Sequence, residues 1–271
     1  NDDARRLQPN SAKQSAAESP LMRNVEINTS GALESSKGFS KKYDLGSNNV
    51  VDAMFEFNPD DNTSFIMAVS NGKVYKINTA DDTVVELGDI PAADVYGGVQ
   101  TIDGGDKVLV IGSDNGLVKV TADAVVALNL IDSHILGTFN GRLFIGKGFT
   151  VHYTPTDSLA NVEGTTAFSS TIRGLVHEGK RLFVFTDIAH QNLFFDYDDQ
   201  FNVSTPLKDS FERLYGSINH QAFANILNDT FYIGNDLRVY KVGAEEFTDE
   251  LGVPRTSSMS DNVDNALANI N

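Results

Sequence analysis

The chain has 271 residues, which is long enough for one large all-β domain or two ordinary domains with a substantial core. It contains no cysteine, which excludes disulfides and thiolate metal sites, and no apolar run of the roughly 18 residues that a membrane span needs. Its 37 acidic and 21 basic residues give a formal charge of −16, which disfavours nucleic acid and anionic lipid as ligands. We therefore expect no membrane insertion and no sequence-specific nucleic-acid partner.

The first 47 residues differ in composition from the rest of the chain. They are rich in Ser, Ala, Asn, Lys and Arg, have few β-branched residues, and hold seven of the 21 basic residues. Apolar and polar residues alternate over Leu21–Ile27, which indicates one short strand. We interpret residues 1–47 as an extended N-terminal arm. Because the chain begins at Asn1 rather than Met, we also expect it to be a processed or partial product.

Beyond the arm, a β-hairpin pattern repeats. In its clearest copy, residues 107–120, an apolar strand is followed by the turn Asp114-Asn115-Gly116 and an alternating strand, as in tight hairpins. Comparable copies begin at Ser64, Lys107, Arg142, Arg181 and Thr230, so that successive starts lie 43, 35, 39 and 49 residues apart. A period of about 40–50 residues with several short strands is typical of β-propellers.

We therefore predict an all-β fold, a β-propeller of about five four-stranded blades over residues 48–243. Residues 244–271 are predicted to form a polar C-terminal tail or short helix, and residues 154–169 give no distinct outer strand for the third blade. Further strands are expected at residues 50–57, 83–87, 96–102, 124–128, 134–139, 171–176, 192–197, 201–204 and 217–227.

An open ring would leave sheet edges unpaired, so one terminal segment is expected to close it. The candidates are Leu21–Ile27 and Glu245–Val253. We favour Leu21–Ile27, because its alternation is clearer and acidic residues and Gly252 interrupt the other segment. Residues 1–20 would then remain to reach a neighbouring subunit.

The arm also resembles a known family. Its pattern consists of Pro9, Ser11, Ala12, Gln14, Asn24, Gly31, Leu33 and Gly38. This pattern, followed directly by propeller-like hairpins, is similar to that of β-propeller proteins of bacteriophage tails, especially the nozzle or tail-tube proteins of short-tailed phages. The resemblance implies a virion structural protein whose arm and propeller build a ring around the DNA exit channel and contact an adaptor and fibres.

Motifs for catalysis are missing from the sequence. It contains no Gly-x-Ser-x-Gly, Gly-x-x-x-x-Gly-Lys, His-Glu-x-x-His or Gly-x-Gly-x-x-Gly. Ser113-Asp-Asn-Gly116 is similar to the turn of sialidase-type propellers, but we interpret it as a hairpin turn. The five histidines share no short ligand spacing, and we expect structural or exposed roles for His134, His152, His177, His190 and His220.

Acidic groups offer two weaker hypotheses. The clusters at Asp60-Asp61-x-Thr63 and Asp196-x-Asp198-Asp199 lack the spacing of a calcium loop, so we interpret them as solvated turns. Asp52, Asp103 and Asp187 are expected at blade entrances and could act as the acid and the base or nucleophile of a propeller glycosidase, but each stands at or beside a turn, where Asp is expected anyway. Phenylalanines of the repeated strands, Phe65, Phe144, Phe183 and Phe231, are expected in the core.

The sequence therefore predicts a non-enzymatic virion protein, a phage tail component that forms a homo-oligomeric ring or lattice with other virion proteins. We expect no catalytic residues, cofactor or metal. The alternatives are a glycan-binding propeller, a lectin or receptor-binding module, and then a five-bladed glycosidase. The absence of Trp weakens the glycan-binding alternative.

Overall fold

The computed structural model describes residues 25–27, 33–35, 43–45, 50–178, 181–194, 207–208, 213–214, 216–220, 222–226, 229–242, 247–248, 254–255 and 257–258. Residues 1–42 with 260–271 form one compact unit, and residues 43–259 form the other. The described residues form strands, turns and loops without a helix, so none of them forms a helix that could cross a bilayer. The prediction of an all-β fold is confirmed for the residues that the structure describes.

In the first unit, β1 (Val25–Ile27) pairs antiparallel with β2 (Leu33–Ser35). The predicted strand Leu21–Ile27 thus has β2 as its partner among the described strands, while residues 21–24 lie outside them. Its role in closing a ring stays a prediction.

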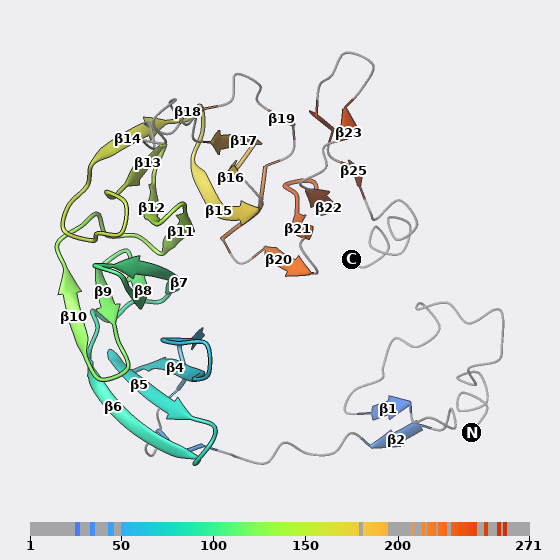
Figure 1. Ribbon diagram of the computed structural model, residues 1–271. Helices are drawn as coiled ribbons and strands as arrows, with labels where there is room; N and C mark the ends of the chain where they lie inside the picture. Colours follow the sequence, from blue (N-terminus) through green and yellow to red (C-terminus); the bar gives the residue numbers. More distant parts are fainter. Residues whose placement is uncertain are drawn as a thin grey trace. The chain divides into compact units, whose positions relative to one another are not determined.

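The described residues of the second unit form five antiparallel sheets of four or five strands, each built mainly from strands that follow one another along the chain (Figure 1). The first sheet consists of β3 (Ala53–Phe57), β4 (Phe65–Ser70), β5 (Lys73–Asn78) and β6 (Thr83–Asp89), and the second of β7 (Gly97–Asp103), β8 (Asp106–Ser113), β9 (Gly116–Val120) and β10 (Val125–Leu128). The third consists of β11 (Ile135–Phe139), β12 (Arg142–Lys147), β13 (Thr150–Tyr153) and β14 (Gly164–Ala167).

The last two sheets are less regular. The fourth contains β15 (Ile172–Glu178), β16 (Arg181–Thr186), β17 (Ala189–Phe194) and β18 (Leu207–Lys208), and β19 (Arg213–Leu214) also pairs with β17. The fifth contains β20 (Phe223–Ile226), β21 (Asp229–Ile233), β22 (Val239–Val242) and β25 (Ser257–Ser258). A separate pair joins β23 (Phe247–Thr248) and β24 (Pro254–Arg255). The outer strand of the fifth sheet therefore comes from the segment predicted as a tail.

Turn chemistry explains the tight connections. Asn71 and Gly72, between β4 and β5, have φ of 51° and 71°, and Asn140 and Gly141, between β11 and β12, have φ of 53° and 70°. Two successive residues with positive φ give the turn whose twist matches that of paired strands, and Asn-Gly tolerates it best. These dipeptides fix the hairpins that the sequence predicted.

Other strands differ from the prediction. β17 begins at Ala189, three residues before the predicted start at 192, because a short turn without glycine precedes it. The Thr186 hydroxyl donates to the Ala189 carbonyl and accepts from its N–H, which closes that turn. β14 lies in the polar segment for which no distinct strand was expected. The segments 196–199, 201–204 and 263–270 lie outside the described residues.

Apolar clusters fill the spaces between consecutive sheets, and the second strand of each middle sheet contributes to two of them. In β8, Leu109 and Ile111 pack with the first sheet, whereas Val108 and Val110 pack with the third. Because successive side chains of a strand point to opposite faces, both faces of such a strand are buried. This explains why these strands are continuously apolar rather than alternating.

The same arrangement recurs in the next two sheets. Phe144 of β12 packs toward the fourth sheet, and Phe183 and Phe185 of β16 pack with Tyr232 of the fifth. Phe144 and Phe183 are buried as predicted, while Phe65 and Phe231 are half-buried. Each fully buried aromatic side chain contributes roughly 1.5–3 kcal/mol through the area removed from water.

The first strands of the first four sheets contact one another in chain order. β3 contacts β7, β7 contacts β11, and β11 contacts β15, which in turn contacts β21. Glycines permit this approach. A Cβ at Gly98 would lie 2.5 Å from the Phe55 ring, and one at Gly174 would lie 2.2 Å from the Phe223 ring.

The closest approach joins β7 to the segment before β11, and it generates a prediction. A Cβ at Gly97 would lie 1.8 Å from the carbonyl oxygen of His134, a backbone atom that cannot rotate away. We expect Gly97→Ala to lower the free energy of unfolding by about 3 kcal/mol or more, at or above the upper end for overpacking. Urea denaturation measures the difference.

Gly98→Ala is the matched control, because its Cβ meets only the Phe55 side chain, which can shift. We expect a smaller loss for this variant than for Gly97→Ala. Equal losses for the two variants would contradict the role given to the His134 carbonyl.

Candidate functional site

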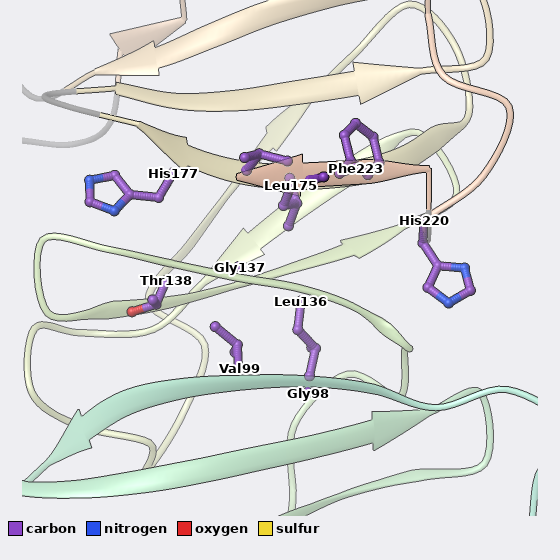
Figure 2. Close-up of a pocket in the computed structure, with 11 residues that line it drawn as sticks. Gly98, Val99, Leu136, Gly137, Thr138, Leu175, His177, His220 and Phe223 are labelled. Atoms are coloured by element: carbon purple, nitrogen blue, oxygen red, sulfur yellow. The ribbon is translucent and has the colours of Figure 1, made fainter. Parts of the chain in front are cut away.

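A cavity of about 390 Å³ lies among the first strands of the second to fifth sheets. Figure 2 shows His177 and His220 on opposite sides of the residues that line it, with Leu175 between them. Glycines and apolar side chains make up most of the lining, which consists of Gly98, Val99, Leu136, Gly137, Thr138, Leu175, Val176, His177, His220, Phe223 and Ala224.

A second cavity of about 220 Å³ shares four of these lining residues, Gly98, Leu136, Leu175 and His220. Its other lining residues are Phe55, Tyr96, Gly97, His134, Ile135 and Gly174. The two cavities therefore adjoin along the first strands. His134 and His220 stand before the starts of β11 and β20, and His177 stands near the end of β15.

Two imidazoles meet at the smaller cavity. The rings of His134 and His220 lie 4.6 Å apart between centroids, edge to face. His134 Nδ1 lies 3.4 Å from Oδ1 of Asp114, at the limit of hydrogen bonding, and no bonding partner satisfies this buried nitrogen. Lys147 lies 3.1 Å from the same carboxylate oxygen.

His220 is the second histidine with an unsatisfied nitrogen. Its Nε2 is buried and has no hydrogen-bond partner in the structure. Burial, together with neighbouring His134, lowers the pKa of His220 below its ordinary value, and Asp114 opposes this only in part. The imidazole is therefore neutral at pH 7, with one nitrogen that donates and one that accepts.

Tyr96 also lines the smaller cavity, and its hydroxyl already has hydrogen-bond partners. The hydroxyl donates to the Pro91 carbonyl at 3.1 Å and accepts the Ala93 N–H at 2.9 Å. Burial raises the pKa of Tyr96, so the phenol stays neutral. The Tyr96 hydroxyl thus has both of its partners, whereas His134 Nδ1 and His220 Nε2 are buried without one.

The remaining histidines have packing roles. His177 lies 4.9 Å from the Phe139 ring, and buried His190 stacks on Phe185 at 5.0 Å. His152 is half-buried in β13, and burial lowers its pKa. The structure therefore brings His134, His177 and His220 to adjoining cavities and leaves His152 and His190 outside their lining. The sequence interpretation missed this grouping, because the three residues come from different repeats. The one signal for this grouping in the sequence was that each of the three histidines lies in or beside the first strand of its repeat.

The three carboxylates considered for glycoside hydrolysis do not share one end of the strands. Asp103 ends β7, whereas Asp52 precedes β3 and Asp187 lies in the turn after β16. Asp52 accepts the Asn71 N–H at 3.1 Å, and Asp187 accepts the Ser170 hydroxyl. Each of these two carboxylates thus stabilises a local turn or connection through a hydrogen bond.

The other sequence candidates occupy turns. Asp60 accepts the Asn62 N–H and the Thr63 hydroxyl, bonds that lower its pKa, and Asp61 pairs with Lys107 at 2.9 Å. Ser113-Asp-Asn-Gly116 is the predicted hairpin turn, with Ser113 opposite Gly116. The cluster at 196–199 lies outside the described residues. Among the residues that the structure describes, no group of three or more His, Asp or Glu could hold a metal ion.

Comparisons with known proteins identify no family. No family model and no curated protein matches the sequence. Among solved structures, a complex of BBS1N with ARL6DN is similar with a TM-score of 0.47 and 11% identity, over 72% of this chain and 67% of that one.

Two further structures give comparable scores. A protein of unknown function from Desulfotomaculum acetoxidans has a TM-score of 0.49 and 14% identity, over 70% of this chain and 68% of that one. A chain of the mitotic checkpoint complex has a TM-score of 0.46 and 16% identity, over 82% and 72%. We base no functional conclusion on these scores.

The contacts of Asp103 generate a prediction of pH dependence. Burial alone would raise its pKa, but Lys119 at 2.8 Å and the Leu159 N–H at 3.0 Å lower it. A carboxylate with a depressed pKa stabilises the fold above its unfolded pKa of about 3.9, and this contribution is lost as the pH falls through the folded pKa.

We expect Asp103→Asn to lower the free energy of unfolding at pH 7 by about 1–2 kcal/mol, as for a hydrogen bond to a charged group. The deficit should shrink as the pH falls below about 4, because the unfolded wild-type chain then binds a proton at this carboxyl, and it should vanish at the lower pH where the folded chain binds one too. Denaturation at several pH values checks this. Asp123→Asn is the control, because that side chain is 91% exposed and should change little. A deficit that is constant with pH would contradict the assignment.

Proposed function

We propose that the chain is a non-enzymatic assembly protein, a structural subunit whose five sheets close into a propeller and dock on neighbouring proteins. Five successive sheets of four or five strands, with contacts between inner strands of consecutive sheets in chain order, support the propeller. The arm's resemblance to phage tail nozzle proteins supports a place in a virion as a tail component. Its partners would be further copies and other virion proteins.

The observation that carries the assembly role is a set of exposed apolar side chains in neighbouring turns. Phe149, Ile188 and Leu237 are 58%, 55% and 66% exposed, and they lie in the turns between the second and third strands of the third, fourth and fifth sheets. We name these three residues the apolar turn set. Contiguous exposed apolar area is typical of protein interaction sites.

Hydrogen bonds connect these three turns. The Ile172 N–H donates to the Gly148 carbonyl at 2.8 Å, and the Asp187 N–H donates to the Thr171 carbonyl at 3.0 Å. Asn235 Nδ2 donates to the Asp187 carbonyl at 3.2 Å. These hydrogen bonds hold the three turns in fixed positions relative to one another and to the adjoining connections. Docking of the apolar side chains on these turns therefore costs less conformational entropy.

Charge supplies the second contact of the proposed assembly. Residues 1–47 hold seven basic and six acidic residues, whereas residues 48–271 hold 14 basic and 31 acidic residues. Copies of the body repel one another, and the arm is the part of the chain that an acidic neighbour attracts. The arm of one subunit would therefore lie on the body of the next.

The first test replaces the apolar turn set. We expect the triple variant Phe149→Ser, Ile188→Ser, Leu237→Ser to weaken self-association by at least tenfold, because the contacts lose most of their apolar area. Sedimentation over a range of protein concentrations measures this.

The control removes three other exposed apolar side chains, from the first two sheets, with Met54→Ser, Val85→Ser and Val126→Ser. Self-association of this control should equal that of the wild type. If both triple variants lose association equally, or neither does, the apolar turn set is not the docking surface.

The second test removes the arm. A chain without residues 1–40 should fail to enter assembled particles, while its far-UV circular dichroism keeps the β spectrum of the sheets. Raised salt should mimic the deletion in part, because screening weakens contacts between an arm and an acidic body. Normal incorporation of the deletion variant into particles would remove the arm from the proposal.

A glycan array and a reducing-sugar assay distinguish the alternative functions. Glycan binding would favour the lectin, and hydrolysis would favour the glycosidase.

A further inference from the structure

The turns and connections of the second unit lie at two ends of its sheets. Because neighbouring strands are antiparallel, the turn between a second and a third strand lies at the same end as the connection that leads into a first strand. We name this the turn-set end, because it contains the apolar turn set. Its described segments are 50–52, 71–72, 90–96, 114–115, 129–134, 148–149, 168–171, 187–188, 216–220, 222 and 234–238.

The other turns, between first and second strands and between third and fourth strands, form the opposite end. Its described segments are 58–64, 79–82, 104–105, 121–124, 140–141 and 154–163.

Exposed apolar side chains distinguish the two ends. At the turn-set end, Val50, Val51, Val95 and Ile218 are exposed in addition to the apolar turn set. The other large exposed apolar residues that the structure describes lie on strands, and they are Met54, Val85, Val126 and Ile233. None lies in the described turns of the opposite end, so the turn-set end is the end that offers apolar contact.

Both ends are acidic. The described segments of the turn-set end hold one basic residue, Arg238, and six aspartates, which are Asp52, Asp94, Asp114, Asp132, Asp187 and Asp236. Those of the opposite end hold no Lys or Arg and seven acidic residues, which are Asp60, Asp61, Asp81, Asp82, Asp123, Asp157 and Glu163.

Lysines of the adjoining strands pair with three of these carboxylates, on Asp61, Asp114 and Asp123, so an acidic excess remains at each end. The turn-set end of one copy and the opposite end of another would therefore repel each other. A basic segment between them would remove this repulsion.

The arm contains such a segment. Residues 4–17 include Arg5, Arg6 and Lys13, the apolar Leu7, and no Asp or Glu. Residues 18–42 separate the segment from the second unit and would span at most roughly 80–90 Å if fully extended. This reach is several times the length of a strand.

The chain enters the second unit at the opposite end of the sheets. Tyr43 and Leu45 pack on the first sheet, against Ala68, Tyr75 and Ile77. The Tyr43 hydroxyl donates to a carboxylate oxygen of Asp82, in the turn between β5 and β6, at 2.9 Å. A copy that lay beyond this end would meet the arm where it leaves its own body.

We propose that residues 4–17 of one copy bind the turn-set end of the next copy, so that copies stack end to end. Leu7 packs on the exposed apolar side chains, and the three basic residues lie between the acidic ends of the two copies. A contact between two different ends is heterologous and can repeat from copy to copy. This inference rests on the proposed function, because it specifies which segment docks on the apolar turn set and in which direction.

Cross-linking between single cysteines tests the contact, since the chain has no cysteine of its own. One full-length chain carries Gln8→Cys, beside Leu7. The other carries an affinity tag and Ser169→Cys, beside the turn of Phe149, whose carbonyl accepts the Phe168 N–H at 2.8 Å. The two chains are mixed in high salt and transferred to low salt, and a short bismaleimide is added. We expect a cross-linked dimer of one tagged and one untagged chain.

Asp123→Cys in the tagged chain is the control for the end of the sheets. This position is 91% exposed and lies at the opposite end. It should give at least tenfold less of the mixed dimer than Ser169→Cys. An equal or larger yield from the Asp123→Cys chain would overturn the proposed direction.

Charge reversal tests the segment. In the Gln8→Cys chain, Arg5→Glu, Arg6→Glu and Lys13→Glu together should lower the yield of mixed dimer at least tenfold. The matched control, Lys37→Glu, Lys41→Glu and Lys42→Glu, changes the net charge equally outside residues 4–17 and should keep at least half of the yield. Equal losses would show a general effect of charge and overturn the proposal. Far-UV circular dichroism checks that every variant keeps the β spectrum.

Two further results separate this inference from the proposed function. A chain with both Gln8→Cys and Ser169→Cys that forms links within one chain, and none between chains, would show that the arm docks on its own body, which overturns the stacking. If sedimentation shows self-association that depends on the apolar turn set while Gln8→Cys forms no link to Ser169→Cys, the arm contact is wrong and the assembly role stands. Absence of self-association would overturn both.

Discussion

The burial of second strands on both faces is the constraint on which the rest of the structure depends. β8 places Leu109 and Ile111 against one neighbouring sheet and Val108 and Val110 against the other. A sheet of four short strands buries little area alone, so its stability comes from the sheets on either side. The first strands are held near one another as a result, and the glycines at 97, 98 and 174 adapt them to that approach. The cavities with the histidines follow from this packing.

The sequence predicted the parts of the fold that local chemistry determines. Asn71-Gly72 and Asn140-Gly141 specify their turns without help from the rest of the chain, and the apolar second strands mark the centre of each sheet. The outer strands were harder to predict. β14, with two threonines between Gly164 and Ala167, has no buried residue, and β25 is a pair of serines. Such strands exist because an edge offers them backbone partners, and that information lies in the neighbouring strand.

The candidate site could be predicted only in part. Carboxylates at turns were correctly interpreted as turn residues at Asp60 and Asp61, because their partners are two or three residues away or in the adjoining sheet. His134 and His220 are 86 residues apart, and no local spacing connects them. They meet because each stands before the first strand of its own sheet, and these strands converge. Only the fold, with its order of sheets, brings such positions together.

The consecutive order of strands has a consequence for how the chain acquires its structure. In the first three sheets every pairing joins neighbours in sequence, so each sheet can form as soon as its own segment is available. Contacts of this kind close small loops and form quickly. The fifth sheet is different, because β22 pairs with β25 across an intervening hairpin of β23 and β24. Its edge is therefore the last to be completed during synthesis, and until then the backbone groups of β22 remain open to other strands.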